Sequence, residues 1–393
     1  MRNIIGSPAE GDDFFNRPKI LDRLRRELNN QANILLVAPR RVGKTSLVIR
    51  LCDDWRKVKP QQAVFLNVEG RGDELAFAEK LIEELARAGL HPELLTRATS
   101  LFTKLRQGLG GKGIQLPGLE ISLGEGADPE HSTLAKVLES IFRKIEDSPV
   151  PVLIAIDELP EFLLTLQKAA EGPRRVAAFL HWLRELRQTY RQKIRWVFLG
   201  SIGLDNFVED QKLHNSINDL KVFALEAFTA PEAEAFLKEL EKTNAPELAD
   251  ADRHEIIRLM GWPIAHHLKL IFEELSEIVP LSIDKAFESL LQPQKFTHFA
   301  TWHQRIETQF SAPDAAACKS ILRHLCLHAQ GRERGQILDL LMVKPTADVE
   351  KVEEQLSRLL IVLQRDGYLL ESGGRYAFRS FLLREYWHRR HVK

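Results

Sequence analysis

Residues 38–46 are Ala38-Pro39-Arg40-Arg41-Val42-Gly43-Lys44-Thr45-Ser46. The stretch matches the phosphate-loop pattern G-x-x-x-x-G-K-[ST] at every fixed position but the first, where Ala38 replaces glycine. The run before it, residues 33–38, is short, apolar and rich in branched side chains, which indicates a buried strand. A helical pattern begins at Lys44. The flanking strand and helix stand where the pattern requires them, which argues against a chance match.

The residue types in this loop suit a polyphosphate. Residues 39–46 are expected to direct successive backbone N–H groups at phosphate oxygens, and the helix N-terminus adds the positive end of a dipole. Gly43 permits close approach of the backbone, and Lys44 reaches the β- and γ-phosphates. The Thr45 hydroxyl is expected to bind Mg²⁺.

An acid pair follows the most apolar run of the chain. Residues 152–156 are Val-Leu-Ile-Ala-Ile, and Asp157-Glu158 come directly after them. Carboxylates at a buried strand end are costly without a cation, so Asp157 is predicted to support the Mg²⁺ held by Thr45. Glu158 is then placed to orient an attacking water. Taken alone, the pair would also suit the start of a helix.

Three weaker signals accompany this site. Ala38 fits the loop provided that its φ is negative. Either Arg40 or Arg41 is expected to contact the nucleotide while the other is solvated, and the residues leave open which. Ser201, after the apolar run 194–199, is a candidate for sensing the γ-phosphate, with a plain Gly-Ser turn as the alternative.

Apolar runs alternate with helical patterns through the first half of the chain. Alternation of this kind predicts an α/β fold with a parallel sheet covered on both faces. A Gly-rich stretch, residues 108–124, is expected to be a hairpin or mobile insert. We therefore predict a P-loop core over residues 1–224.

Strands give way to helices from about residue 225. Thr229-Ala-Pro-Glu232 predicts a capping box that opens a helix. The C-terminal block, residues 315–393, shows three helical patterns and then a short hairpin, residues 368–378. This order is typical of a winged helix. We predict a helical lid domain over residues 225–305 and a winged-helix domain over residues 306–393.

Composition limits the classes that remain. The 393 residues carry 55 basic and 55 acidic side chains, so a generally polybasic protein is excluded. Three cysteines cannot form a disulfide framework, and apolar runs are too short for a membrane span. A cytoplasmic protein without membrane contact is expected.

The chain resembles the archaeal-type ATPases, a clade of the STAND/AAA-like P-loop NTPases with a C-terminal winged helix. The resemblance spans nearly the whole chain and is carried by short motifs. These are Phe15-Asn16-Arg17, the loop Pro39-Arg-Arg-Val-Gly-Lys-Thr-Ser-Leu47, Ile156-Asp-Glu158, Leu199-Gly-Ser-Ile-Gly203, Gly261-Trp-Pro263 and Tyr376-Ala-Phe-Arg-Ser-Phe-Leu-Leu-Arg-Glu-Tyr386. The Arg-Arg-x-Gly-Lys-Thr-Ser loop is the most specific of them. Ala38 and the Gly-rich insert depart from the family pattern.

The resemblance implies further site residues. Asn16 and Arg17 become candidates near the adenine, and Gly261 and Pro263 are implied to pack against the base. For the last two, a helix-breaking turn is the alternative. The residues alone do not distinguish ATP from GTP, and no guanine-reading motif is recognised. The choice of ATP therefore rests on the resemblance.

Nucleic acid is an alternative partner. The expected recognition helix, residues 348–358, holds four acids against two bases, which phosphates would repel. The C-terminal tail is basic, and it can serve either a nucleic-acid strand or docking within the protein. Its basic residues are Arg375, Arg379, Arg384, Arg389, Arg390 and Lys393.

Three functions follow from these observations. The first is an ATP-hydrolysing switch that acts on a protein partner or on its own assembly, with ATP and Mg²⁺ as cofactors. The second is an ATP-dependent DNA-loading protein similar to origin-recognition ATPases. The third is a scaffold that binds nucleotide without hydrolysing it. No arginine finger is identifiable, and Arg191 and Arg195 are only guesses.

Overall fold

The computed structural model describes residues 1–58, 60–90, 96, 98–100, 129–200, 203–342 and 348–392. These residues form two compact units. The sheet unit contains residues 16–37 and 44–224, and the helical unit contains residues 1–15, 38–43 and 225–393. The Gly-rich stretch 108–124 and Ser201 lie outside the described residues.

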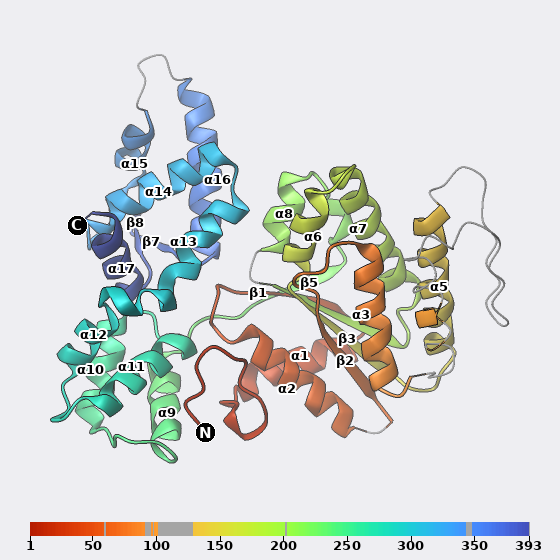
Figure 1. Cartoon of the computed structure of the whole chain (residues 1–393), viewed down its shortest axis with the longest axis horizontal. Coiled ribbons are helices and arrows are strands. Elements are labelled where there is room, and N and C mark those ends of the chain that lie inside the picture. The colour runs from red at the N-terminus through yellow and green to blue at the C-terminus, as the bar shows by residue number, and fades with distance from the viewer. Residues whose placement is uncertain are drawn as a thin grey trace. The chain divides into compact units, whose positions relative to one another are not determined.

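A five-stranded parallel sheet is the centre of the sheet unit (Figure 1). Its order is β2-β3-β4-β1-β5. The strands are β1 (Asn33–Val37), β2 (Gln62–Asn67), β3 (Val152–Asp157), β4 (Ile194–Leu199) and β5 (Leu220–Ala224). The apolar runs 33–38, 152–156 and 194–199 of the sequence form β1, β3 and β4, which confirms the α/β prediction. Strand β5 was not predicted, because Lys221 interrupts its apolar run and Val222 is exposed at the sheet edge.

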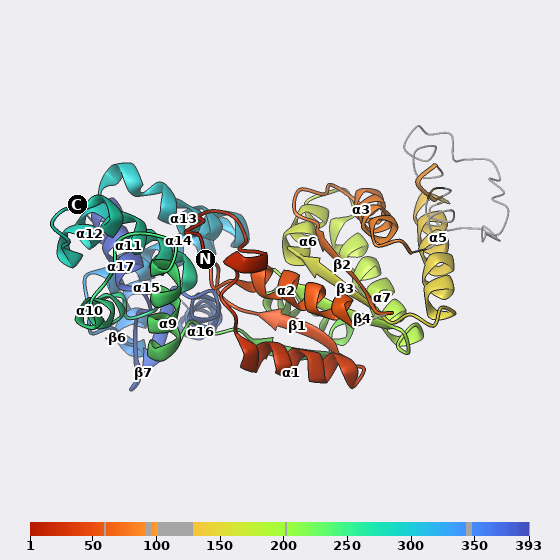
Figure 2. The same ribbon diagram turned by 90° about the horizontal axis from the view of Figure 1, so that it is seen from below.

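Helices cover both faces of this sheet (Figure 2). Side chains alternate between the faces of a strand. Ile154 and Ile156 belong to one core with helices α3, α5, α6, α7 and α8, whereas Leu153 and Ala155 point to the face where α1 and α2 lie. The helices are α1 (Pro18–Asn29), α2 (Lys44–Lys57), α3 (Glu74–Arg87), α5 (Pro129–Glu146), α6 (Leu159–Gln167), α7 (Gly172–Thr189) and α8 (Leu204–Asp210).

In the helical unit, the segment that starts at residue 225 first forms four helices. They are α9 (Ala230–Glu241), α10 (Asp250–Met260), α11 (Ala265–Glu277) and α12 (Ile283–Leu290). The predicted capping box opens α9, since Thr229 and Glu232 each bond the other's backbone N–H. The N-terminal residues pack in the same unit, where Phe15 stacks edge-on against Phe228 and Phe236. Short 3-10 helices cover Gly11–Asp13, His214–Ser216 and Pro293–Lys295.

The rest of the helical unit combines helices with a small antiparallel sheet of order β6-β8-β7. Helices α14, α15 and α16 and the β7–β8 hairpin follow one another along the chain, and their assignment as a winged helix stays a prediction. The elements are α13 (Thr297–Gln309), α14 (Ala312–Cys326), β6 (Arg332–Glu333), α15 (Arg334–Leu341), α16 (Val349–Arg365), β7 (Leu369–Ser372), β8 (Arg375–Phe378) and α17 (Phe381–His391). None of the helices in the described ranges is long and apolar enough to span a bilayer. The boundary between lid and winged helix stays a prediction.

Candidate functional site

The loop between β1 and α2 has the backbone geometry that its sequence predicts. Strand β1 ends at Val37 and α2 begins at Lys44. Gly43 has φ +104°, a conformation that side chains with a Cβ rarely adopt. The φ of Ala38 is not positive, so alanine fits the first position of the motif. Arg41 has φ +63°, which is sparsely populated for a residue other than glycine.

The structure brings Thr45 and Asp157 together although 112 residues separate them in sequence. Thr45 lies in the first turn of α2, and Asp157 is the last residue of β3. The Thr45 hydroxyl donates a hydrogen bond of 2.7 Å to Asp157 Oδ2. Lys44, beside Thr45, is also buried, with 7% of its surface exposed. The loop and the acid pair therefore meet at the carboxyl ends of the strands, where open α/β sheets bind ligands.

Burial sets the electrostatics of Asp157. The residue is 1% exposed, and the backbone N–H of Glu158 donates to its Oδ1 at 2.9 Å. Burial, followed by repulsion from Glu158, raises the pKa of Asp157 to about 6. The hydrogen bond from Thr45 and the charge of Lys44 act in the opposite direction. The carboxylate is thus held in a position where an added cation would offset its burial.

These two side chains fit a magnesium ion. Thr45 and Asp157 offer hydroxyl and carboxylate oxygen, the ligand type that Mg²⁺ prefers. No group of three or more His, Cys, Asp or Glu side chains that could hold a metal occurs among the described residues. Magnesium does not require such a group, because it is usually held by one or two protein oxygens together with water and substrate phosphates.

Glu158 lies beside the end of the neighbouring strand. Its φ of +58° places it in the left-handed region, immediately before α6. A Cβ added at Gly200, which follows β4, would meet Pro160 Cδ at 2.5 Å and Glu158 Oε2 at 3.5 Å. The close approach explains the glycine and puts the Glu158 carboxylate at the ends of β3 and β4.

The other predicted site residues are not brought together within one unit. Asn16 is exposed and Arg17 precedes α1, both in the sheet unit. Gly261 ends α10 with φ +66°, and the Pro263 carbonyl accepts from the Phe228 N–H at 3.0 Å, both in the helical unit. Their roles at a base stay predictions.

Arg195, one of the two guesses for an arginine finger, has its guanidinium bonded to backbone carbonyls. Its guanidinium donates to the backbone carbonyls of Leu28 at 3.0 Å and Arg191 at 2.6 Å. Further bonds go to the carbonyls of Ile194 and Gln192. These bonds fix the side chain at the start of β4, the end of the strand away from Asp157. These bonds keep Arg195 away from this chain's own acid pair, and the identity of an arginine finger stays untested.

His266 contacts a residue of the phosphate loop, a contact that the sequence did not identify. Arg41 Nη1 lies 3.4 Å from His266 Nδ1, within the helical unit to which residues 38–43 also belong. The sequence shows His266-His267 only as a pair without a ligand set. Their position just after Gly261-Trp-Pro263 was the one available signal.

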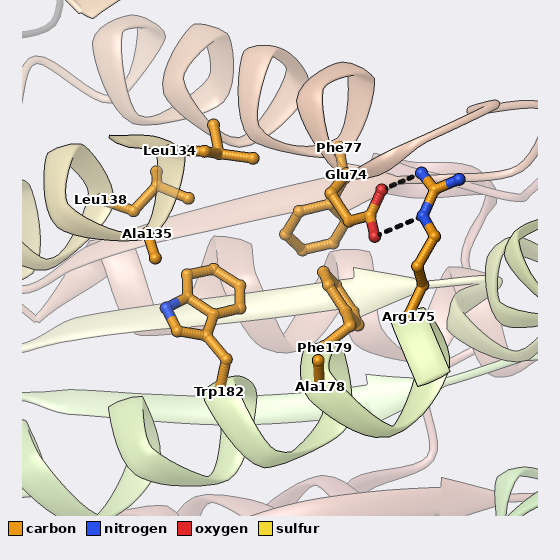
Figure 3. A pocket seen from close by; sticks show the side chains of 9 residues that line it. All are labelled: Glu74, Phe77, Leu134, Ala135, Leu138, Arg175, Ala178, Phe179 and Trp182. Atoms are coloured by element: carbon orange, nitrogen blue, oxygen red, sulfur yellow. Dashed lines mark hydrogen bonds and ion pairs between the residues drawn. The ribbon is translucent and has the colours of Figure 1, made fainter. Parts of the chain in front are cut away.

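A small cavity lies in the sheet unit among α3, α5 and α7 (Figure 3). It has a volume of about 140 Å³ and is lined mainly by apolar side chains, among them Phe77, Phe179 and Trp182. Glu74 and Arg175 form a two-pronged ion pair at one end, with Arg175 Nε 3.0 Å from Glu74 Oε1. None of the phosphate-loop or acid-pair residues lines it.

Comparison with solved structures shows the fold class. The chain is similar to the Walker-type ATPase PABY2304 of Pyrococcus abyssi, with a TM-score of 0.67 and 17% identity over 99% of this chain and 100% of that one. It is also similar to the ORC2 protein of Aeropyrum pernix, solved as ADPNP-ADP complexes, with a TM-score of 0.56 and 15% identity over 98% and 94%. Identities this low show the fold alone. The chain therefore has a P-loop ATPase fold.

A more distant structural match supports no statement about the site. The A. pernix ORC1 protein in complex with DNA matches over 97% of this chain and 94% of that one, with 14% identity and a TM-score of 0.40, which is too low to support an argument about DNA. No family profile and no curated protein sequence matches the chain.

Proposed function

We propose that this protein binds ATP with Mg²⁺ and hydrolyses it. The observation that carries the proposal is the 2.7 Å hydrogen bond from Thr45 to Asp157, which joins the phosphate loop to the acid at the end of β3. A P-loop ATPase needs these two oxygens close together at one metal.

Each residue of the site then has a defined task. The backbone of residues 39–46 and the N-terminus of α2 bind the phosphates, and the Lys44 ammonium orients the β- and γ-groups. Thr45 and Asp157 would hold Mg²⁺, which when bound neutralises charge on the phosphate oxygens. Glu158 orients the attacking water and holds the proton that the water loses. Ser201 is proposed to contact the γ-phosphate.

Recognition of the base rests on the resemblance to archaeal-type ATPases. We propose that Asn16 and Arg17 lie near the adenine and that Gly261 and Pro263 pack against it. The loop residues Pro39, Val42, Gly43 and Ser46 complete the proposed nucleotide contacts, together with one of the two arginines, Arg40 or Arg41.

The output proposed for hydrolysis is a switch on a protein partner or an assembly. A nucleotide shifts a conformational equilibrium only when it binds two states unequally. ATP and ADP differ by the γ-phosphate, so the side chains that face it determine which state each nucleotide favours.

Magnesium dependence tests the metal assignment. We expect phosphate release from ATP to stop when EDTA exceeds the Mg²⁺ concentration. Thr45→Ala should lower turnover by about 100-fold, because it removes a metal ligand. Thr45→Ser keeps the hydroxyl and should stay within about threefold of wild type. Turnover that persists in excess EDTA would remove magnesium from the proposal.

The basic tail favours docking within the protein over DNA. Its arginines are largely occupied inside the helical unit. Arg375 pairs with Glu333 at 3.0 Å, Arg384 with Glu385 at 2.8 Å and Arg389 with Glu288 at 2.7 Å. Arg379 lies 3.9 Å from Glu226, and Arg390 donates a hydrogen bond of 2.8 Å to the Tyr386 hydroxyl. Lys393 lies outside the described residues. Few of these cations are left for phosphates.

We therefore expect duplex DNA to leave ATP turnover unchanged within about twofold at low salt. The measurement is phosphate release in 50 mM against 200 mM salt, roughly the range over which phosphate contacts weaken most visibly. Stimulation by DNA that fades as salt rises would instead support the DNA-loading function.

A further inference from the structure

Arg41, a residue of the phosphate loop, contacts helix α11 within the helical unit. Arg41 Nη1 lies 3.4 Å from Nδ1 of His266, the second residue of α11. Arginine has donors only, so Nδ1 must accept and the ring proton must sit on Nε2. His266 is 8% exposed, and burial, followed by the charge of Arg41, lowers its pKa to about 2. The ring is therefore neutral at physiological pH.

Arg41 has no anionic partner within the described residues. Its hydrogen bond there goes to the neutral His266, and the adjacent His267 is neutral too, with its pKa lowered by burial to about 3. Burial, then the charge of Arg40, lowers the pKa of Arg41. A half-buried guanidinium is stabilised best by an opposite charge, and neutral rings do not supply one. The chemistry of this position calls for an anion.

The loop around Arg41 is firmly held at its start. A Cβ added at Gly367 would come within 2.7 Å of Pro39 Cβ and 2.9 Å of Trp262 Cη2, so these residues pack tightly. Arg41 then takes a positive φ, two residues before Gly43. A left-handed residue with a Cβ persists only where its surroundings fix it, and such residues cluster at ligand sites. The backbone thus holds Arg41 in a fixed position within the loop that is proposed to bind phosphate.

We propose that the Arg41 guanidinium binds a phosphate group of the nucleotide and leaves His266 to do so, so that phosphate binding releases α11 from the loop. This inference rests on the proposed function and assigns Arg41, not Arg40, as the arginine that binds phosphate. His266 is a positioning residue that holds Arg41 while phosphate is absent. Arg40, the neighbouring arginine of the same loop, supplies the matched control.

The test measures affinity for Mg·ADP and for a non-hydrolysable Mg·ATP analogue by calorimetry. Arg41→Gln keeps the bulk and removes the charge, and it should weaken binding by about tenfold or more. Arg40→Gln should stay within about threefold of wild type. His266→Ala removes the competing acceptor and should tighten binding, and this gain should vanish in the double variant with Arg41→Gln. His266→Asn keeps an acceptor near the place of Nδ1 and should resemble wild type.

A second readout separates the switch from a purely structural role. Amide hydrogen exchange in α11 should quicken when the ATP analogue binds to wild type, and it should not respond in Arg41→Gln. Two results would overturn the inference: wild-type affinity in Arg41→Gln, or a loss in His266→Ala as large as that in Arg41→Gln. If wild type hydrolyses ATP while Arg41→Gln binds normally, only this inference fails. If wild type binds no nucleotide, the proposed function fails with it.

Discussion

Lys44→Ala should lower ATP turnover by at least about 100-fold, which corresponds to about 2.7 kcal/mol of transition-state stabilisation. The ammonium stands at the start of α2, next to Thr45, where charge develops on the transferring phosphoryl group. No other lysine lies in the phosphate loop. The measurement is steady-state phosphate release at saturating Mg·ATP, made together with nucleotide affinity.

Lys57→Ala is the matched control for this variant. Lys57 ends the same helix and pairs with Asp54 at 2.9 Å on an exposed face, so its loss should change turnover by less than about twofold. Thermal melts of both variants show whether the fold is retained. Turnover of a folded Lys44→Ala protein at the wild-type level would mean that the loop does not bind the transferring phosphate.

Glu158→Gln should reduce turnover by about 100-fold or more while ATP affinity stays near that of wild type. The amide keeps the size of the side chain beside Gly200 but cannot take the proton of the attacking water. Binding and chemistry should therefore separate in this variant, and the ATP complex should accumulate. Single-turnover phosphate release, with ATP affinity on the same sample, is the measurement.

Glu161→Gln provides the comparison. Glu161 lies in the first turn of α6, three residues beyond Glu158, and should tolerate the same change with less than about twofold effect. Unchanged turnover in Glu158→Gln would remove the role assigned to Glu158. Nucleotide binding without any turnover in wild type would favour the non-hydrolysing scaffold.

The sequence predicted much of the sheet unit because its signals are local. Branched apolar runs bounded by Gly, Pro and charged residues determine β1 to β4. The meeting of Thr45 and Asp157 follows from the same signals, since parallel strands bring their carboxyl ends to one edge. Strand β5 and helix α6 were missed. The first is a short edge strand interrupted by Lys221, and the second is too short and too apolar to show a helical period.

The contact of Arg41 with His266 could not be predicted from the sequence. The two residues are 225 positions apart, and no spacing or periodicity links the loop to α11. The same holds for the bond from Arg195 to the carbonyl of Leu28, a residue of α1 that is 167 positions away. The arginine pairs of the tail are likewise tertiary, such as Arg389 with Glu288. Charge counts in a sequence do not show which cations are already paired.

Binding of Mg·ATP to the wild-type protein, followed by phosphate release, tests the central claim most directly. Calorimetry with a non-hydrolysable analogue should give about one nucleotide per chain, with affinity that falls when Mg²⁺ is withdrawn. Phosphate release from ATP on the same preparation should exceed that of Lys44→Ala. Absence of nucleotide binding at roughly millimolar concentrations, the weak end of useful affinities, would contradict the account.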